Sequence, residues 1–305
     1  MKFFDRFKKN KDSGLPDKYK GIITPEDYQF VLGIAKKYHA ENGLKILRIY
    51  QGEIVAEVNG EEQHRFLDNL VRHLSAYEKK DWAAAIYEHF DKFKDHRRAF
   101  KYLYKDYEYA AKFLRVLIKD TGLYGDEQHQ MVCRCDFPGT TTFLVIEYEE
   151  QFAYVTRKAS ADWDKSDDEL FVAAISNTPV EEVRVRKHQY CDKFPTYVFL
   201  SGDYSASLML DLPFRLPVAF GTYGSMIAIP TKGTAFAHPI ETADLMELVE
   251  TLTPMMIKLY NEDPGNITTD FFWRYGDHIE KFPTGEDENG PYVRLPEDLL
   301  TLFKG

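Results

Sequence analysis

The stretch TFLVIEYEEQFAYVTR, residues 142–157, decides the fold class of this chain. It holds two runs rich in β-branched and aromatic residues, 142–148 and 152–157, and this pattern predicts two successive strands. The run MVCRCDF at 131–137 precedes them and predicts a third strand. Strands joined by such short connections pair in the antiparallel direction. The stretch therefore indicates a mainly antiparallel sheet within an α+β fold.

The chain beyond this stretch continues the strand pattern. EVRVRKHQY (182–190) and TYVFLSG (196–202) predict two further strands. SMIAIP (225–230) and TAFAHP (234–239) predict a hairpin, because a short turn that contains Gly233 separates the two runs. All four runs are expected to join the same sheet.

Two helices are expected to pack on this sheet. Ser166 and Glu169 have the spacing of a capping box, in which each side chain binds the backbone N–H of the other residue, so a helix starts here. Thr242 is expected to open a second, long helix that continues to Tyr260. Strands and helices together predict a C-terminal α+β domain over residues 123–305.

The N-terminal part of the chain predicts a helix-rich domain with a small hairpin, over residues 21–122. A helix is expected to follow Thr24, because threonine is a favoured cap and the next residue is proline. KILRIY (45–50) and EIVAEV (53–58) predict the hairpin. The apolar spacing of residues 61–120 predicts further helices.

Residues 1–20 form a distinct basic tip before these domains. The tip carries a net charge of +4, whereas the whole chain carries −10. On a helical wheel its phenylalanines gather on one side with cations around them, which is typical of a segment that contacts a membrane surface or a partner. The alternative is a solvated terminus. The candidate residues are Phe3, Phe4, Phe7, Lys8 and Lys9.

Composition and charge limit the class of protein. With 305 residues, of which 44% are hydrophobic, the chain can bury a substantial core. The net charge of −10 disfavours a nucleic-acid binder and favours a basic protein partner. Three cysteines are too few for a disulfide framework, and the sequence has neither a secretory signal nor an apolar run of about 18 residues. We therefore expect a cytoplasmic protein without a transmembrane span.

The cysteines and nearby histidines raise the question of a zinc site. Structural zinc motifs place about two to four residues between cysteines, whereas a single residue separates Cys133 from Cys135. Residues two apart on a strand share one face, and free cysteine is commonly buried. The sequence therefore favours the alternate residues of 131–137 as one buried apolar row, with zinc as the alternative and no metal or cofactor predicted. The alternative ligands are His129, Cys133, Cys135, His188 and Cys191.

Two polar stretches come directly after apolar strands, SGDYSAS at 201–207 and the turn at 231–233. Loops at strand ends often carry binding residues, because the strands hold them rigidly. The region could therefore line a pocket for a small ligand or substrate. The alternative is an ordinary helix cap and hairpin turn. The candidate residues are Asp203, Tyr204, Ser207 and Lys232.

The sequence contains none of the sharp catalytic motifs. It has no P-loop, no Gly-x-Gly-x-x-Gly fingerprint and no Gly-x-Ser-x-Gly elbow. This favours a non-catalytic protein-interaction or binding module, for example an immunity-type partner of a toxin. One alternative is a ligand-binding protein or enzyme that uses Asp203, Tyr204 and Lys232. Another is peripheral membrane association through residues 1–11.

Four stretches within about residues 110–262 carry a family resemblance. They are FLVIEYEEQFAYV, ADWDKSDDELFVAAISN, SGDYSASLMLDL and GSMIAIPTKGTAFAHPI. In order and character they resemble the uncharacterised bacterial YtpQ-like family. The resemblance implies a bacterial cytosolic protein, and it transfers no catalytic residues because the family has no established activity.

Overall fold

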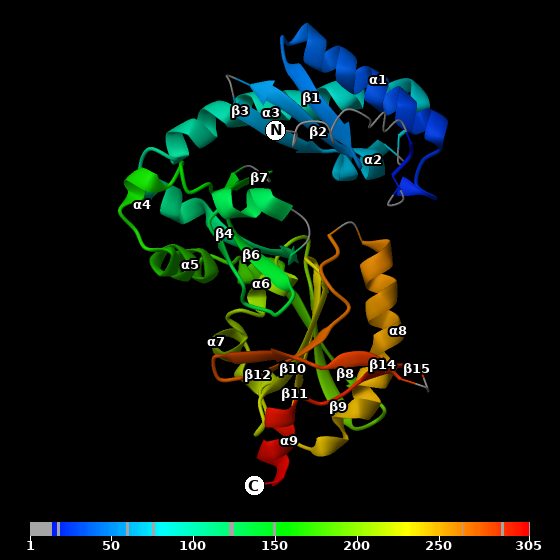
Figure 1. Cartoon of the computed structure of the whole chain (residues 1–305), viewed down its shortest axis with the longest axis vertical. Helices are drawn as coiled ribbons and strands as arrows, with labels where there is room; N and C mark the ends of the chain where they lie inside the picture. Colours follow the sequence, from blue (N-terminus) through cyan, green and yellow to red (C-terminus); the bar gives the residue numbers. More distant parts are fainter. Residues whose placement is uncertain are drawn as a thin grey trace, which may run out of the picture. The chain divides into compact units, whose positions relative to one another are not determined.

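The computed structural model combines helices with several antiparallel sheets, which confirms the predicted α+β class. The chain divides into two compact units, residues 1–99 and 100–305, which can be followed by colour in Figure 1. The candidate tip residues Phe3, Phe4, Phe7, Lys8 and Lys9 lie outside the described residues. The described residues are 14–16, 19–58, 61–74, 77–121, 125–148, 151–263, 265–287 and 290–304.

The first unit packs helices against a three-stranded antiparallel sheet of order β1-β2-β3. Its first helix begins as predicted, because the Thr24 hydroxyl accepts a hydrogen bond from the backbone N–H of Asp27 at 3.1 Å. Apolar side chains of that helix, such as Val31 and Leu32, pack with Ile54 of the sheet in one core. The elements are α1 (Pro25–Glu41), β1 (Lys45–Tyr50), β2 (Glu53–Val58), β3 (Glu61–Phe66), α2 (Asp68–Leu74) and α3 (Trp82–Leu103), whose last turn runs past the division after Ala99.

Two segments that the sequence assigned to helices are strands. β3 pairs with β2, so the predicted hairpin is part of a three-stranded sheet. β4 (Leu114–Asp120) pairs along its whole length with β6 (Thr140–Tyr148). Its apolar run is short and buried, and such a run fits a buried strand as well as a helix. Because β4 belongs to the second unit, the division after Ala99 falls before the boundary expected at residue 122.

The second unit contains two main sheets. The smaller has the order β4-β6-β5, and β7 also pairs with β6. α5 packs on it through Leu170 and Phe171, and the predicted capping box between Ser166 and Glu169 is present at the start of this helix. The further elements here are α4 (Tyr107–Ala110), β5 (Cys133–Arg134), β7 (Gln151–Tyr154) and α5 (Asp167–Ser176).

The larger sheet has six antiparallel strands in the order β13-β12-β10-β11-β9-β8. It contains the four strands predicted between residues 182 and 239, including the hairpin of β10 and β11. α8 contributes Leu248, Leu252 and Met256 to the apolar core on one face of the sheet, and residues of α6 and α7 join the core on the other. The elements are β8 (Arg184–Tyr190), β9 (Phe194–Leu200), α6 (Ser205–Leu208), α7 (Leu212–Arg215), β10 (Ser225–Thr231), β11 (Thr234–Pro239), α8 (Met246–Glu262), β12 (Phe271–Tyr275) and β13 (His278–Lys281).

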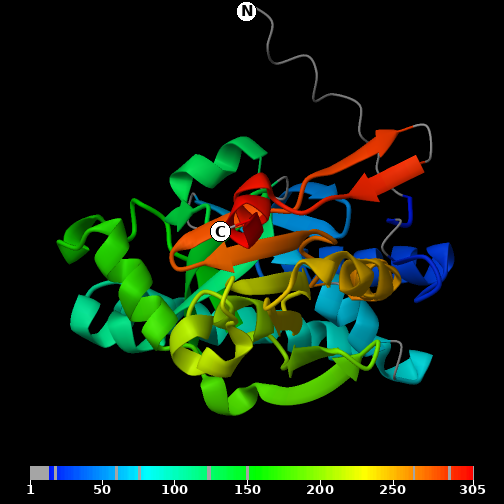
Figure 2. The same ribbon diagram turned by 90° about the horizontal axis from the view of Figure 1, so that it is seen from below.

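The chain ends with a small hairpin and a short helix. The hairpin consists of β14 (Thr284–Asp287) and β15 (Gly290–Val293), and the helix is α9 (Glu297–Lys304). In Figures 1 and 2, α9 in red lies next to the orange β12–β13 hairpin. Leu299 of α9 is fully buried in the same core as Trp273 of β12. The last helix is therefore packed against the edge of the large sheet.

Candidate functional site

The candidate residues at the strand ends lie close together, but they divide into an outer and an inner pair. Asp203 and Lys232 form the outer pair, an ion pair between half-buried side chains. Asp203 does not cap the helix that follows. Instead, the hydroxyl of Ser201 accepts hydrogen bonds from the backbone N–H groups of Tyr204 and Ser205, both at 2.9 Å. The carboxylate of Asp203 is thereby left for Lys232.

The backbone of Lys232 also holds this turn in place. Its N–H donates to the carbonyl of Gly265 at 2.8 Å, and its carbonyl accepts from the N–H of Ala206 at 3.2 Å. Gly265 fits here because a Cβ atom would lie 2.6 Å from Cγ of Lys232. The polar groups of Lys232 therefore bind other groups of the fold. This favours the interpretation of the region as a helix start and a hairpin turn over that of an open pocket lip.

Tyr204 and Ser207 form the inner pair. The Ser207 hydroxyl is buried and donates to the carbonyl of Val116 at 2.7 Å, so it fastens α6 to β4. Tyr204 is only 2% exposed, and its hydroxyl has no hydrogen-bond partner of ordinary geometry among the described residues. Burial, followed by the nearby carboxylate of Glu147, raises the pKa of the Tyr204 phenol above its usual value. A group held neutral and out of solvent is not placed to bind a ligand from solution.

Charged side chains surround the Tyr204 hydroxyl. Arg115 pairs with Glu147 at 3.1 Å, and both side chains are largely buried. Burial, followed by the charge of Glu147, raises the pKa of the Glu182 carboxyl. Neighbouring carboxylates occur in catalytic sites, but here the guanidinium of Arg115 already pairs with the carboxylate of Glu147. The ion pair between Arg115 and Glu147 explains how both charges can be buried where β4, β6 and α6 meet.

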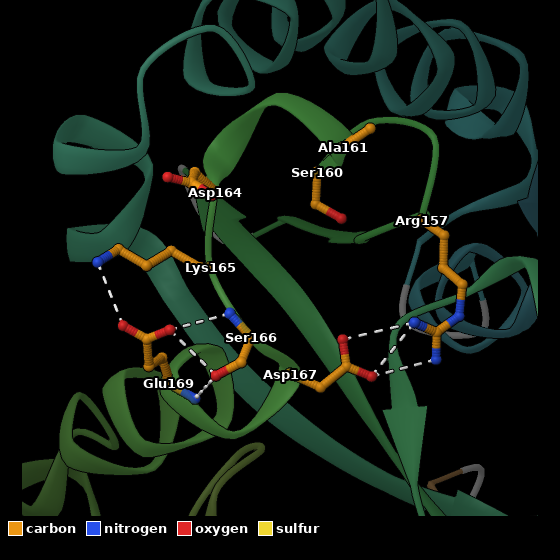
Figure 3. A pocket seen from close by; sticks show the side chains of 8 residues that line it. All are labelled: Arg157, Ser160, Ala161, Asp164, Lys165, Ser166, Asp167 and Glu169. Carbon is orange, nitrogen blue, oxygen red and sulfur yellow. Dashed lines mark hydrogen bonds and ion pairs between the residues drawn. The ribbon is translucent and has the colours of Figure 1, made fainter.

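A shallow hollow of about 580 Å³ lies elsewhere, at the start of α5, and is drawn in Figure 3. Its lining side chains bind one another. Arg157 pairs with Asp167 at 3.2 Å, and Lys165 pairs with Glu169 at 3.3 Å. The hydroxyl of Ser166 and the carboxylate of Glu169 complete the capping box. The charges of this hollow therefore serve the helix start and do not converge on its open space.

The predicted buried row of 131–137 is wrong for the cysteines. Cys135 is exposed and Cys133 is half-buried. The ladder of β5 covers only Cys133 and Arg134, so the chain turns away before Cys135. Val132, which was expected to face outward, is buried instead, and its N–H donates to the carbonyl of Val155 at 2.8 Å. Burial raises the pKa of the Cys133 thiol, which favours its protonated form.

The alternative zinc ligands do not gather in the part of the chain that the structure describes. Cys191 lies in the turn between β8 and β9, where its sulfur is 3.3 Å from the hydroxyl of Thr251. His188 is an exposed residue of β8, and His129 is exposed in a separate segment before β5. A grouping of His278, Glu280 and Asp298 is found instead.

The most distinctive exposed element is β8, the edge strand of the large sheet. Among the described strands it pairs only with β9, so its other side is open. All residues from 184 to 189 are exposed, on both faces of the strand. The strand carries Arg184, Arg186 and Lys187 and no carboxylate. The sequence RVRKHQY already shows this, because it lacks the apolar alternation of a strand with one buried face.

Comparison with known proteins gives no relative in which a strand like β8 has a described role. No family model, curated protein or solved structure matches this chain. The resemblance to the YtpQ-like family stays a prediction. Among the described residues, no helix is long and apolar enough to cross a membrane.

Proposed function

We propose that this protein is a non-catalytic protein-interaction module that binds an extended acidic segment of a partner along β8. The strand that supports the proposal is seven residues long, basic and exposed on both faces, and among the described strands it pairs on one side only. The partner segment would add as a further strand to the six-stranded sheet.

The backbone of β8 supplies the general part of the binding. In an antiparallel pair, the N–H and C=O groups of alternate residues point toward the neighbour, and those of the remaining residues point away. Seven residues pair with β9 from Arg184 opposite Leu200 to Tyr190 opposite Phe194. The outward groups of β8 are therefore held in strand geometry before a partner arrives, which lowers the entropic cost of adding a strand.

The side chains of β8 supply the selectivity. Arg184 and Arg186 lie on one face, and Lys187 lies on the other, because residues two apart share a face. Like charges directly opposite one another destabilise a strand pair, so a second copy of β8 is a poor partner. Carboxylates opposite these cations are favourable. The overall charge of −10 suggested a basic partner, but the local charge of this edge favours an acidic one.

A labelled peptide tests this proposal directly. The probe is a seven-residue peptide of alternating threonine and glutamate with a fluorescent tag, titrated with the full chain at low salt and followed by fluorescence polarisation. The first variant replaces Arg184, Arg186 and Lys187 with glutamate. The matched control replaces three exposed lysines elsewhere with glutamate, so that the total charge change is the same. The control lysines are Lys36, Lys80 and Lys258.

We expect saturable binding to the natural chain, at least tenfold weaker binding to the β8 variant, and a change of less than about twofold in the control. A tenfold loss corresponds to about 1.4 kcal/mol. A peptide N-methylated at every residue keeps its carboxylates but has no backbone donors, and we expect it not to bind. Equal binding by the β8 variant or by the methylated peptide would refute strand addition. So would an absence of saturable binding up to about 1 mM, the limit of weak association.

A further inference from the structure

A second feature, independent of β8, lies at the opposite edge of the large sheet. His278 and Glu280 are two residues apart on β13, and Asp298 belongs to the first turn of α9. One ligand atom of each lies within 4.8 Å of the others. The pair on β13 shares one face of the strand because side chains two apart point the same way. Two elements distant in sequence therefore bring one imidazole and two carboxylates together.

Aromatic side chains that pack against one another support this group of three residues. The ring of Trp273 packs edge-on against the ring of His278, with centroids 5.7 Å apart. The indole N–H of Trp273 donates to the carbonyl of Tyr223 at 2.7 Å. The ring of Tyr223 in turn packs against Phe303 of α9, with centroids 4.7 Å apart. The same aromatic residues thus support both β13 and α9, which limits how far the three ligands can separate.

The two carboxylates lack a cationic side chain. Among the described residues, no lysine or arginine forms an ion pair with Glu280 or Asp298. The imidazole Nε2 of His278 lies 3.6 Å from Oε2 of Glu280, beyond an ordinary hydrogen bond. Neighbouring Lys281 is engaged with Asp270 at 2.8 Å. Two like charges close together are unfavourable unless a cation lies between them.

We propose that His278, Glu280 and Asp298 bind a divalent transition-metal ion of the zinc type. Imidazole and carboxylate are both common zinc ligands, with bond lengths of about 2.0–2.2 Å. The imidazole favours zinc over magnesium or calcium, which prefer oxygen ligands alone. Three protein ligands leave a position for water, in keeping with the partial exposure of the group. The ion would tie the last helix to β13.

Isothermal titration of the full chain with zinc chloride tests the site, with magnesium chloride as the comparison. The site variants are His278→Ala and Asp298→Asn, and circular dichroism confirms that each is folded. Free thiols also bind zinc, so the matched control replaces Cys133, Cys135 and Cys191 with serine. Hydrogen exchange of α9 with and without zinc provides a second readout.

We expect one zinc ion per chain for the natural protein and for the cysteine control, with at least tenfold weaker binding in each site variant. Zinc should slow the amide exchange of α9 in the natural protein and not in His278→Ala. The proposal fails if the site variants keep full affinity, if the cysteine control loses it, or if zinc leaves the exchange of α9 unchanged. Magnesium binding of equal strength would also contradict the assignment.

Discussion

Replacing Ser207 with alanine tests whether this residue has the structural role that the hydrogen bond to Val116 indicates. Ser207 is 1% exposed, and its hydroxyl donates at 2.7 Å to a carbonyl 91 residues earlier in the chain. Its removal leaves the Val116 carbonyl without that donor, and an unsatisfied buried polar group costs about 1–3 kcal/mol. For a unit of this size, each kcal/mol lowers Tm by about 2–4 °C.

Ser176 offers a matched control for this change. Its hydroxyl also lies in a helix and donates at 2.8 Å to a carbonyl, that of Val172, but it is exposed to water. Both substitutions gain the same helix propensity of alanine over serine, so this contribution cancels in the comparison. We expect Ser176→Ala to change stability by less than about 0.5 kcal/mol. The difference between the two variants isolates the buried hydrogen bond.

Guanidinium unfolding measures both variants in a Trp82→Phe chain, in which the fluorescence comes from Trp163 and Trp273 of the second unit. Amide exchange of β4 provides a local readout, because the lost bond ends on that strand. The reasoning would be refuted if Ser207→Ala and Ser176→Ala destabilised the protein equally. It would also be refuted if Ser207→Ala weakened binding of a ligand while leaving stability unchanged, since that would place the hydroxyl in a binding site.

Three further predictions follow from the packing and the pKa shifts. Gly265→Ala should destabilise the protein by about 1–3 kcal/mol, because the new Cβ overpacks Lys232, and Lys232→Ala should recover part of this loss in a double-mutant cycle. Hydrogen bonds with a threonine and a lysine lower the pKa of Asp244 to about 2. The stabilising contribution of this carboxylate is therefore present above its unfolded pKa and is lost as pH falls toward 2. The difference in unfolding free energy between the natural chain and Asp244→Asn should shrink over that pH window. At pH 8, a thiol reagent should modify exposed Cys135 faster than half-buried Cys133, whose pKa burial raises. Because Cys191 is also exposed, stopped-flow absorbance on Cys191→Ser chains that carry a second serine at Cys133 or at Cys135 assigns the two rates.

Local signals in the sequence were sufficient for much of the second unit. The strands β8 to β11 follow from short runs bounded by turn residues, and the start of α5 follows from its capping box. β4 could not be assigned in this way, because the apolar spacing of LRVLIKD suits a buried strand and a helix alike. Only its partner β6, reached after a long connection, decides between the two. The same holds for β3, whose residues are mostly polar and which forms a strand because it pairs with β2.

The candidate sites depend even more on tertiary structure. The sequence singled out Asp203 and Lys232 because both follow apolar strands, but the pairing of β9 with β11 brings their side chains together. It could not show that Ser207 points inward, since the direction of that hydroxyl is set by β4. His278 and Glu280 are visible as an alternate pair on a strand, but Asp298 joins them only through the packing of α9.

The charge of β8 has a kinetic consequence. A strand with three cations and no carboxylate, on a chain of net charge −10, gives the molecule a permanent separation of charge. An approaching acidic segment is attracted to one edge and repelled elsewhere, so its orientation is partly set before contact. The association rate should therefore fall as added salt shortens the Debye length below about 10 Å. Dissociation of the proposed complex would instead require breaking backbone hydrogen bonds, so salt should affect it much less.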